Sequence, residues 1–316
     1  MLDLRPVFFV VGLMVAALGA AMFAPMMVDL AYQDRSWRTF GVSGILTALL
    51  GAALALATYT PKPVLRARGA FLLTVLSWVA LSAFAALPFL MDPPKLSVAD
   101  AFFEATSGIT TTGSTILTGL DDMPKGILLW RSILQWIGGV GIIVTAMAVL
   151  PMLRIGGMQL FRLESSDMGE KILPRAASLA AAIGGIYVIL TTLCTFGYMW
   201  VGMSGFDAIA HAMTTVATGG FSTSDLSMGG FMDNGADLVC IAFMMAVGMA
   251  LGMYLLMMRG NLRAPLHDPQ VRTFVLIMAA LILLVTVSLW TGSEFSNSRA
   301  LRPSAFNVVS IVTGTG

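Results

Sequence analysis

Thr110-Thr111-Thr112-Gly113, Val216-Ala217-Thr218-Gly219 and Thr313-Gly314-Thr315-Gly316 are three copies of one short threonine-glycine signature. Each copy follows a short, mildly polar segment, and each such segment follows a long apolar stretch. The last glycines of the copies stand 106 residues apart (113 to 219) and then 97 residues apart (219 to 316). A repeat of this length that carries a hairpin and a threonine-glycine loop indicates an ion pore. Rings of backbone carbonyls from such loops replace the water around a cation.

Composition places the chain in a membrane. Of its 316 residues, 57% are hydrophobic and 11% are charged, and the mean hydropathy is +0.86. Soluble domains carry roughly 25% charged residues. Because apolar stretches run along the whole length, we expect an all-α integral membrane protein with no separate soluble domain.

Seven stretches are long and apolar enough to cross a bilayer, which needs about 20 residues per helix. The three short segments cannot cross, and we interpret them as re-entrant pore helices. Irregular backbone at membrane depth is tolerated only where it is buried in protein or lines a water-filled cavity. The alternative is that they are amphipathic helices on the membrane surface. The expected spans are 6–30, 39–58, 69–91, 127–150, 178–202, 236–258 and 271–292, and the short segments are 97–109, 204–217 and 303–312.

The order span, pore helix, filter loop, span predicts repeated units around a pore. Two leading transmembrane spans (1–60) precede a first pore unit (61–155) and a second pore unit (156–265). A third unit (266–316) stops at the loop itself, so we expect this unit to be incomplete and a fourth unit to be absent from the chain.

Charged residues indicate an orientation. If the threonine-glycine loops enter from outside, the inner segments hold eleven basic and five acidic residues, a net charge of +6. The outer segments hold the other seven basic and twelve acidic residues, a net charge of −5, which together give the +1 of the whole chain. Basic residues favour the cytoplasmic side of a membrane. The sequence therefore predicts a multi-pass protein with a cytoplasmic N-terminus, and inner loops near Lys62, Arg162 and Arg263.

The loop residues are candidate ligands for a metal cation through their backbone carbonyls. Glycine lets the chain turn carbonyls inward, and the negative C-terminal ends of the short helices point toward the same loops. The candidate site residues are Thr111, Thr112, Gly113, Ala217, Thr218, Gly219, Gly314, Thr315 and Gly316.

Other polar residues near the loops have structural interpretations. Asp100, Glu104 and Asp207 lie near the starts of short helices, where carboxylates complement the helix dipole and hydrogen-bond at the outer surface. A direct ion-ligand role is the alternative for these carboxylates. Arg131 lies near the outer start of a span and is expected to reach toward the interface. His211 is expected to be packed or hydrogen-bonded.

Small residues within the spans are expected to serve packing. Gly138-Gly139-Val140-Gly141 favours close helix contact, with a gating bend as the alternative. Cys194 and Cys240 are expected to pack as small apolar residues. The spans hold no paired carboxylates, Ser/His pair or His-Glu metal motif at depth. An enzyme is therefore not expected, and neither is an organic cofactor.

Three stretches of the chain carry a family resemblance. They are Phe103-Glu-Ala-Thr-Ser-Gly-Ile-Thr-Thr-Thr-Gly113, Ala217-Thr-Gly-Gly-Phe-Ser-Thr223 and Gly156-Gly-Met-Gln-Leu-Phe-Arg162. These stretches resemble the TrkH branch of the Trk/Ktr/HKT potassium-uptake proteins, and the resemblance covers essentially the whole chain. It implies four span–pore helix–span units in a pseudo-fourfold array around one pore. It also implies a homodimer among the lipids of the inner cell membrane, a TrkA-like cytoplasmic nucleotide-binding regulatory subunit and no nucleic-acid partner.

Individual residues of this chain match the filter positions of that family. The resemblance therefore implies uptake of potassium ions through a filter. Gly113 is the residue that favours potassium, because serine at this place in plant relatives is associated with sodium. A sodium or potassium–sodium symport pathway is one alternative, and a non-conducting truncated membrane scaffold is another. The filter positions are Thr112-Gly113, Thr218-Gly219 and Thr315-Gly316, preceded by Thr111, Ala217 and Gly314.

Overall fold

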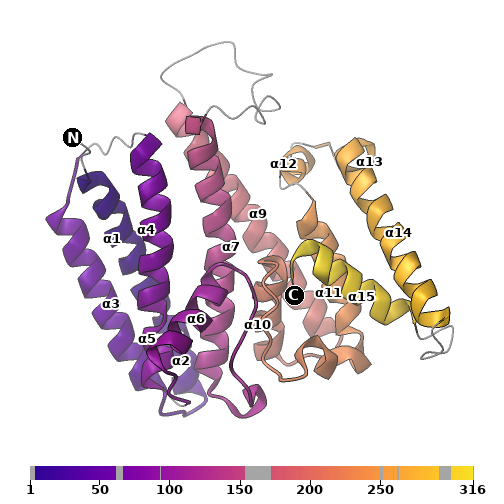
Figure 1. The fold of residues 1–316 in the computed structure, drawn as a ribbon, viewed down its shortest axis with the longest axis horizontal. Coiled ribbons are helices and arrows are strands. Elements are labelled where there is room, and N and C mark those ends of the chain that lie inside the picture. The colour runs from indigo at the N-terminus through magenta and orange to yellow at the C-terminus, as the bar shows by residue number, and fades with distance from the viewer. Residues whose placement is uncertain are drawn as a thin grey trace. The chain divides into compact units, whose positions relative to one another are not determined.

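The computed structural model describes residues 4–61, 67–92, 94–153, 172–249, 252–258, 260–261, 263–291 and 300–315. Within these residues the chain forms helices and no strand, which confirms the all-α expectation (Figure 1). The chain divides into two compact units. One holds residues 1–110 and 114–180, and the other holds residues 111–113 and 181–316.

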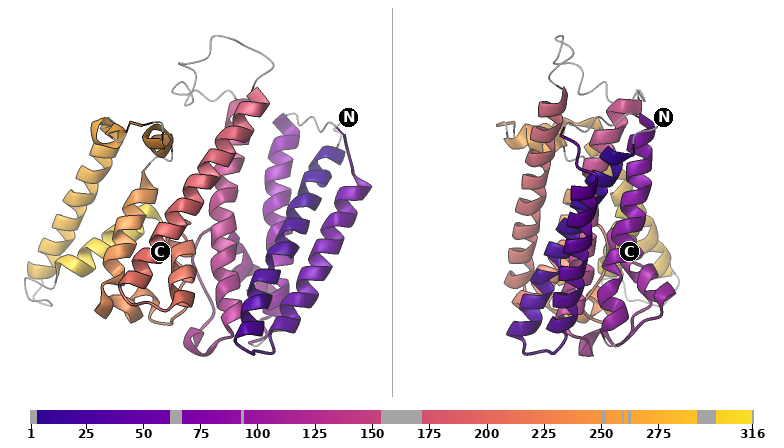
Figure 2. Two further views of the ribbon diagram at one scale, coloured as in Figure 1. Left: turned by 180° about the vertical axis from the view of Figure 1, so that it is seen from behind. Right: turned by 90° about the vertical axis from the view of Figure 1, so that its left-hand side faces the viewer.

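The first unit is built around two long helices in close contact, α1 (Arg5–Ala21) and α3 (Trp37–Ala57), which run side by side in Figures 1 and 2. Glycines let the two backbones approach. A Cβ built at Gly19 of α1 would lie 2.4 Å from the Ala48 nitrogen, and one at Gly51 of α3 would lie 2.3 Å from the Ala16 nitrogen. Small residues serve helix contact in membranes because lipid supplies no hydrophobic drive between apolar helices.

In this unit one short helix, α6, lies between longer helices. The short helix α6 packs against α4 and α7, and α7 also packs against α2. The elements are α2 (Phe23–Ala31), α4 (Ala67–Ala85), α5 (Leu87–Met91), α6 (Val98–Ile109), the 3-10 turn η1 (Leu120–Asp122) and α7 (Lys125–Leu153).

Two buried polar contacts fix the first turns of α7. The Gly126 N–H donates to Asp29 Oδ1 of α2 at 2.5 Å, and the indole N–H of Trp130 donates to the Ala85 carbonyl of α4 at 3.0 Å. Both Asp29 and Trp130 are fully buried. The start of α7 is therefore held in place on two sides.

The second unit also contains short helices packed against their neighbours. Here α15 (Leu301–Thr313) packs against α11 (Ala236–Gly248) and α14 (Pro269–Thr291). In Figures 1 and 2, α15 runs back at an angle to α14, and its C-terminal end lies beside α11. The remaining elements are α9 (Ile172–Trp200) from residue 181 onward, α10 (Gly205–Val216), η2 (Ser227–Asn234), α12 (Gly252–Met258) and α13 (Ala264–His267).

Five helices in the described residues are long and apolar enough to cross a membrane. They correspond to five of the seven expected spans. The expected span 127–150 falls within α7, a helix of 29 residues. The five candidates are Arg5–Ala31, Trp37–Ala57, Arg68–Met91, Ala180–Trp200 and Pro269–Thr291. Of the inner-loop residues, Lys62 and Arg162 lie outside the described residues, and the orientation of the chain stays a prediction.

The expected continuous span 236–258 is wrong. α11 ends at Gly248, and Met249 takes an extended conformation (φ −75°, ψ 150°). The hydroxyl of Tyr254 in α12 donates to the Ala246 carbonyl at 2.5 Å, which is one of the last four carbonyls of α11. Those carbonyls have no partner within their own helix, so a side chain helps to close the break. Apolar composition alone gave no sign of it.

We expect Gly19→Ala to destabilise the protein, because the added methyl would overlap the backbone of α3. Overpacking of this kind costs roughly 1–3 kcal/mol. The matched control is Gly185→Ala in α9, where a new Cβ meets nothing within 4 Å. Thermal unfolding in detergent should show a lower Tm for Gly19→Ala and an unchanged or higher Tm for Gly185→Ala. Equal Tm values would contradict the close contact of α1 and α3.

Candidate functional site

Two of the short helices begin with the same cap. The Ser97 hydroxyl accepts from the Asp100 N–H at 3.2 Å and donates to the Asp100 carboxylate at 2.7 Å. Ser204 and Asp207 make the same pair of bonds at 3.1 and 2.7 Å, 107 residues further along the chain. A side-chain oxygen that accepts from the first turn satisfies a donor that the helix leaves free. These contacts confirm the capping interpretation of Asp100 and Asp207.

A residue with left-handed backbone follows each of the three short helices within two positions. Thr111 has φ 57°, Thr218 has φ 50° and Gly314 has φ 76°. Positive φ is unfavourable for β-branched threonine, because Cβ crowds the following carbonyl. Strained backbone of this kind is concentrated at functional sites, where the surrounding structure holds it.

The ends of α10 and α15 share one hydrogen-bond pattern, the Schellman motif. At α10, Thr218 N–H donates to the Thr215 carbonyl at 3.1 Å, and Gly219 N–H donates to the Thr214 carbonyl at 2.8 Å. At α15, the equivalent bonds from Gly314 to Ile311 and from Thr315 to Ser310 are 3.2 and 2.8 Å. The second and third loops therefore leave their helices in the same way.

The backbone corrects the expected equivalence of the loops by one residue. Two residues after Thr111 stands Gly113 with φ 81°, and two residues after Thr218 stands Gly220 with φ 78°. Gly220, and not Gly219, is thus the counterpart of Gly113. Ala217 has right-handed helical backbone (φ −76°, ψ −7°) and belongs to the end of α10.

The corrected interval is 107 residues between the first and second loops (111 to 218) and 96 between the second and third (218 to 314). In this register the third counterpart of Gly113 is Gly316, which lies outside the described residues. The sequence predicted the wrong counterpart of Gly113 because Gly219 and Gly220 are adjacent, and only their backbone dihedral angles distinguish them.

After each of the first two loops, a side-chain hydroxyl forms a hydrogen bond with a residue in the middle of the short helix that precedes the loop. The Thr115 hydroxyl donates to the Glu104 carboxylate at 2.8 Å and accepts from the Leu117 N–H at 3.1 Å. The Ser222 hydroxyl lies 3.0 Å from Nε2 of His211 and accepts from the Ser224 N–H at 3.1 Å. Each residue of the second set stands 107 positions after its counterpart.

His211 is packed and hydrogen-bonded, as the sequence analysis expected. Its side chain is 2% exposed, and Nδ1 lies 2.8 Å from the Asp207 carbonyl. A carbonyl only accepts, so Nδ1 carries a proton and donates. Since the Ser222 hydroxyl can donate to a bare Nε2, the neutral tautomer satisfies every contact.

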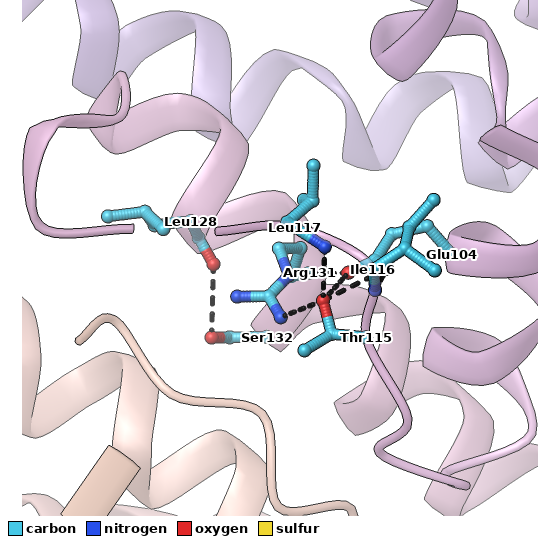
Figure 3. Close-up of polar contacts among 7 residues, drawn as sticks. All are labelled: Glu104, Thr115, Ile116, Leu117, Leu128, Arg131 and Ser132. Atoms are coloured by element: carbon cyan, nitrogen blue, oxygen red, sulfur yellow. Dashed lines mark hydrogen bonds and ion pairs between the residues drawn. The ribbon is translucent and has the colours of Figure 1, made fainter. Parts of the chain in front are cut away.

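Glu104 and Arg131 form a buried ion pair, which Figure 3 shows beside Thr115. Arg131 Nε donates to Glu104 Oε1 at 2.8 Å, and the two side chains are 1% and 0% exposed. The predictions for both residues were wrong: Glu104 lies in the middle of α6 and not at its capped start, and Arg131 does not extend to the interface. Hydrophobicity cannot show a partner that approaches from another helix.

The end of α6 lies directly on α7. A Cβ built at Gly138 would lie 1.9 Å from the Ile109 carbonyl oxygen, whereas one at Gly141 would meet nothing within 4 Å. The packing interpretation of the glycine-rich stretch is confirmed at Gly138. Ile109 stands two residues before left-handed Thr111, so this contact fixes the helix end from which the loop departs.

The two cysteines lie in the packed surroundings of α10. Cys194 and Cys240 are free thiols with 0% and 3% exposure, as expected for packing residues. The Thr215 hydroxyl in the last turn of α10 lies 3.8 Å from Cys240 Sγ and 2.7 Å from the Tyr198 hydroxyl. This end of α10 therefore contacts α9 and α11.

The C-terminal ends of the short helices carry partial negative charge beside the loops. Among the described residues, no cluster of three or more His, Cys, Asp or Glu side chains could hold a metal ion. The contacts of the Thr115 and Ser222 hydroxyls were not predicted from the sequence. Their shared distance of eleven residues from Glu104 and His211 is the signal that could have found them.

Known proteins share this architecture. A family model, TrkH, described as a cation transport protein, matches residues 38–293. The chain is 38% identical over 319 residues to the Trk system potassium uptake protein TrkH of Halomonas elongata, covering 100% of this chain and 66% of that protein. It is also 38% identical over 317 residues to the Escherichia coli K12 protein of the same name, covering 99% of this chain and 66% of that one.

A solved structure has the same fold. The crystal structure of the potassium transporter TrkH from Vibrio parahaemolyticus superimposes with a TM-score of 0.90 at 36% sequence identity. The match covers 100% of this chain and 65% of that one. The chain thus spans about two thirds of the length of the relatives that it matches.

We expect Gly220→Ala to impair ion transport more than Gly219→Ala, because only Gly220 has a left-handed φ. The strain of a side chain in this conformation is roughly 1–2 kcal/mol. Gly119→Ala is the matched control, since Gly119 also has positive φ (75°) but lies outside the proposed filter loops, and a new Cβ there meets nothing within 4 Å. Flux into proteoliposomes and Tm should be measured together. The corrected register fails if Gly219→Ala is the more damaging of the two loop variants.

Proposed function

Because the chain belongs to the TrkH family of cation transport proteins, we propose that it takes part in potassium uptake through a filter of backbone carbonyls. The repeated exit from the short helices supports this proposal most directly. A left-handed residue is followed two positions later by a left-handed glycine in the first loop and again in the second. The proposed ion-facing residues are Thr111, Thr112, Gly113, Thr218, Gly219, Gly220, Gly314, Thr315 and Gly316.

The grouping of the loops supports a common filter. The tripeptide Thr111–Gly113 belongs to the compact unit that also holds the loops after α10 and α15, although the residues on both sides of it belong to the other unit. Three loops around a common centre would present their carbonyls to one ion. Rings of carbonyls select cations by the number and field strength of the ligands.

The short helices contribute charge to the same proposal. α6, α10 and α15 each direct a C-terminal end toward the proposed filter residues that follow it. A helix carries about half a negative elementary charge at this end, which stabilises a nearby cation. Carbonyls and dipoles hold an ion more loosely than carboxylates do, as conduction requires.

The remaining parts of the proposal concern assembly. The relatives are named as members of a Trk system, which supports a multi-component transporter. We propose a homodimer in the inner membrane with a cytoplasmic nucleotide-binding regulatory subunit and a cytoplasmic N-terminus. The excess of basic residues on the proposed inner side supports this orientation.

We expect Gly113→Ser to lower the ratio of potassium to sodium flux while leaving the amount of folded protein near that of the wild type. Gly113 has a left-handed φ of 81°, and a side chain there would displace the neighbouring carbonyls. The test is flux of each ion into proteoliposomes containing the purified protein as expressed from its own gene. Unchanged discrimination in a well-folded variant would show that Gly113 is an ordinary turn glycine.

A further inference from the structure

We propose that Glu104 and Arg131 form a buried ion-pair clamp on Thr115, and that this clamp positions the first loop for ion discrimination. The proposal rests on the ion-filter function proposed for that loop. Glu104 and Arg131 act through Thr115 and do not touch the ion, so they are positioning residues.

The clamp holds a continuous piece of chain directly after the loop. Thr115 follows Gly113 by two residues, and its hydroxyl accepts from Arg131 Nη2 at 3.0 Å while donating to Glu104. The Glu104 carboxylate also accepts from the Ile116 N–H at 3.2 Å. The Thr115 hydroxyl in turn accepts from the Leu117 N–H, so three consecutive residues are tied to one ion pair.

Both ends of the first loop are therefore fixed to the same two helices. Before the loop, the Ile109 carbonyl lies against Gly138 of α7. After the loop, Thr115 is bonded to Glu104 of α6 and Arg131 of α7. Left-handed threonine is unfavourable by itself, and a loop that contains one needs surroundings that hold it.

Comparison with the second loop shows that the ion pair is the part of the clamp that differs. His211, Ser222 and Ser224 reproduce the hydroxyl contacts without an ion pair. In the third short helix the corresponding residue is Asn307, 96 positions after His211, and it is also uncharged. The second loop is thus tied back to its helix without an ion pair, through His211 and through the Thr223 hydroxyl, which donates to the Asp207 carboxylate at 2.7 Å. Among Glu104, His211 and Asn307, only Glu104 carries a charge. In the first loop this charge and that of Arg131 can influence the binding of a cation.

The ion pair is neutral as a whole, so it adds no net charge beside the proposed filter. Removing Arg131 would leave a buried negative charge, and removing Glu104 would leave a buried positive charge. Unpaired charges act strongly where water is excluded. The two losses should therefore shift the affinity for a cation in opposite directions.

The first test removes only the link between the ion pair and the loop. Thr115→Val takes away the hydroxyl and keeps the shape, Thr115→Ser restores the hydroxyl, and Thr74→Val is a matched control. The Thr74 hydroxyl bonds only within its own helix, to the Ala70 carbonyl of α4. Each variant of the protein, as expressed from its own gene, is reconstituted, and potassium and sodium fluxes are measured.

Thr115→Val removes all three hydrogen bonds of the hydroxyl. We expect it to lower the potassium-to-sodium flux ratio by roughly two- to tenfold, a change in discrimination equal to the net free energy of about one hydrogen bond. Thr115→Ser and Thr74→Val should keep the wild-type ratio. A purely structural role would lower the yield of folded protein and both fluxes together without changing the ratio, and that result would overturn the proposal. If Gly113→Ser changes the ratio but Thr115→Val does not, the clamp is wrong and the filter stands. If neither changes it, the filter assignment itself fails.

The second test examines charge. Glu104→Gln should raise the half-saturating potassium concentration, Arg131→Gln should lower it, and the double variant should return toward the wild-type value. Shifts in the same direction for both single variants would contradict the electrostatic part of the proposal. If the single variants do not accumulate, the double variant and the Thr115 series decide.

Discussion

The structure depends on how the backbone leaves three short helices within an apolar protein. Backbone groups in a membrane must find partners inside the protein or face water. At α10 and α15 the Schellman bonds occupy carbonyls of the last helical turn, those of Thr214, Thr215, Ser310 and Ile311. The proposed filter uses the carbonyls of the loop residues that follow these turns.

The loops need support because their conformation is unfavourable. Thr111 and Thr218 hold positive φ angles that a β-branched residue seldom adopts. Side chains from the middle of α6 and α10 return to the residues that follow each loop, through Glu104 in the first and His211 in the second. The two loops thus share one geometry, although one uses an ion pair and the other an uncharged imidazole.

Hydrophobicity and spacing predicted the helical class, the three short helices and the approximate positions of the loops. These features are local, because the length of an apolar stretch and the presence of glycine depend only on consecutive residues. The predictions for Glu104 and Arg131 were wrong because the environment of each side chain is set by a distant part of the chain. Arg131 is buried only because Glu104 approaches it from another helix, and no pattern around either residue shows that partnership.

Two further errors have different physical causes. The Gly219-Gly220 doublet left the register of the second loop open by one residue, which only the positive φ of Gly220 resolves. The interruption after Gly248 is an irregularity within apolar sequence, where composition continues unchanged while the backbone does not. Sequence periodicity reports which residues are apolar, and it cannot report the dihedral angles that they adopt.

X-ray diffraction from crystals grown with thallous ions would test most directly whether the loops coordinate a cation through their carbonyls. Thallous ions substitute for potassium in size and charge, and their anomalous scattering marks their position. The expected result is an anomalous peak bounded by the loop carbonyls that follow α6, α10 and α15. Peaks found only beside carboxylate side chains, with none at these three loops, would contradict the proposed filter.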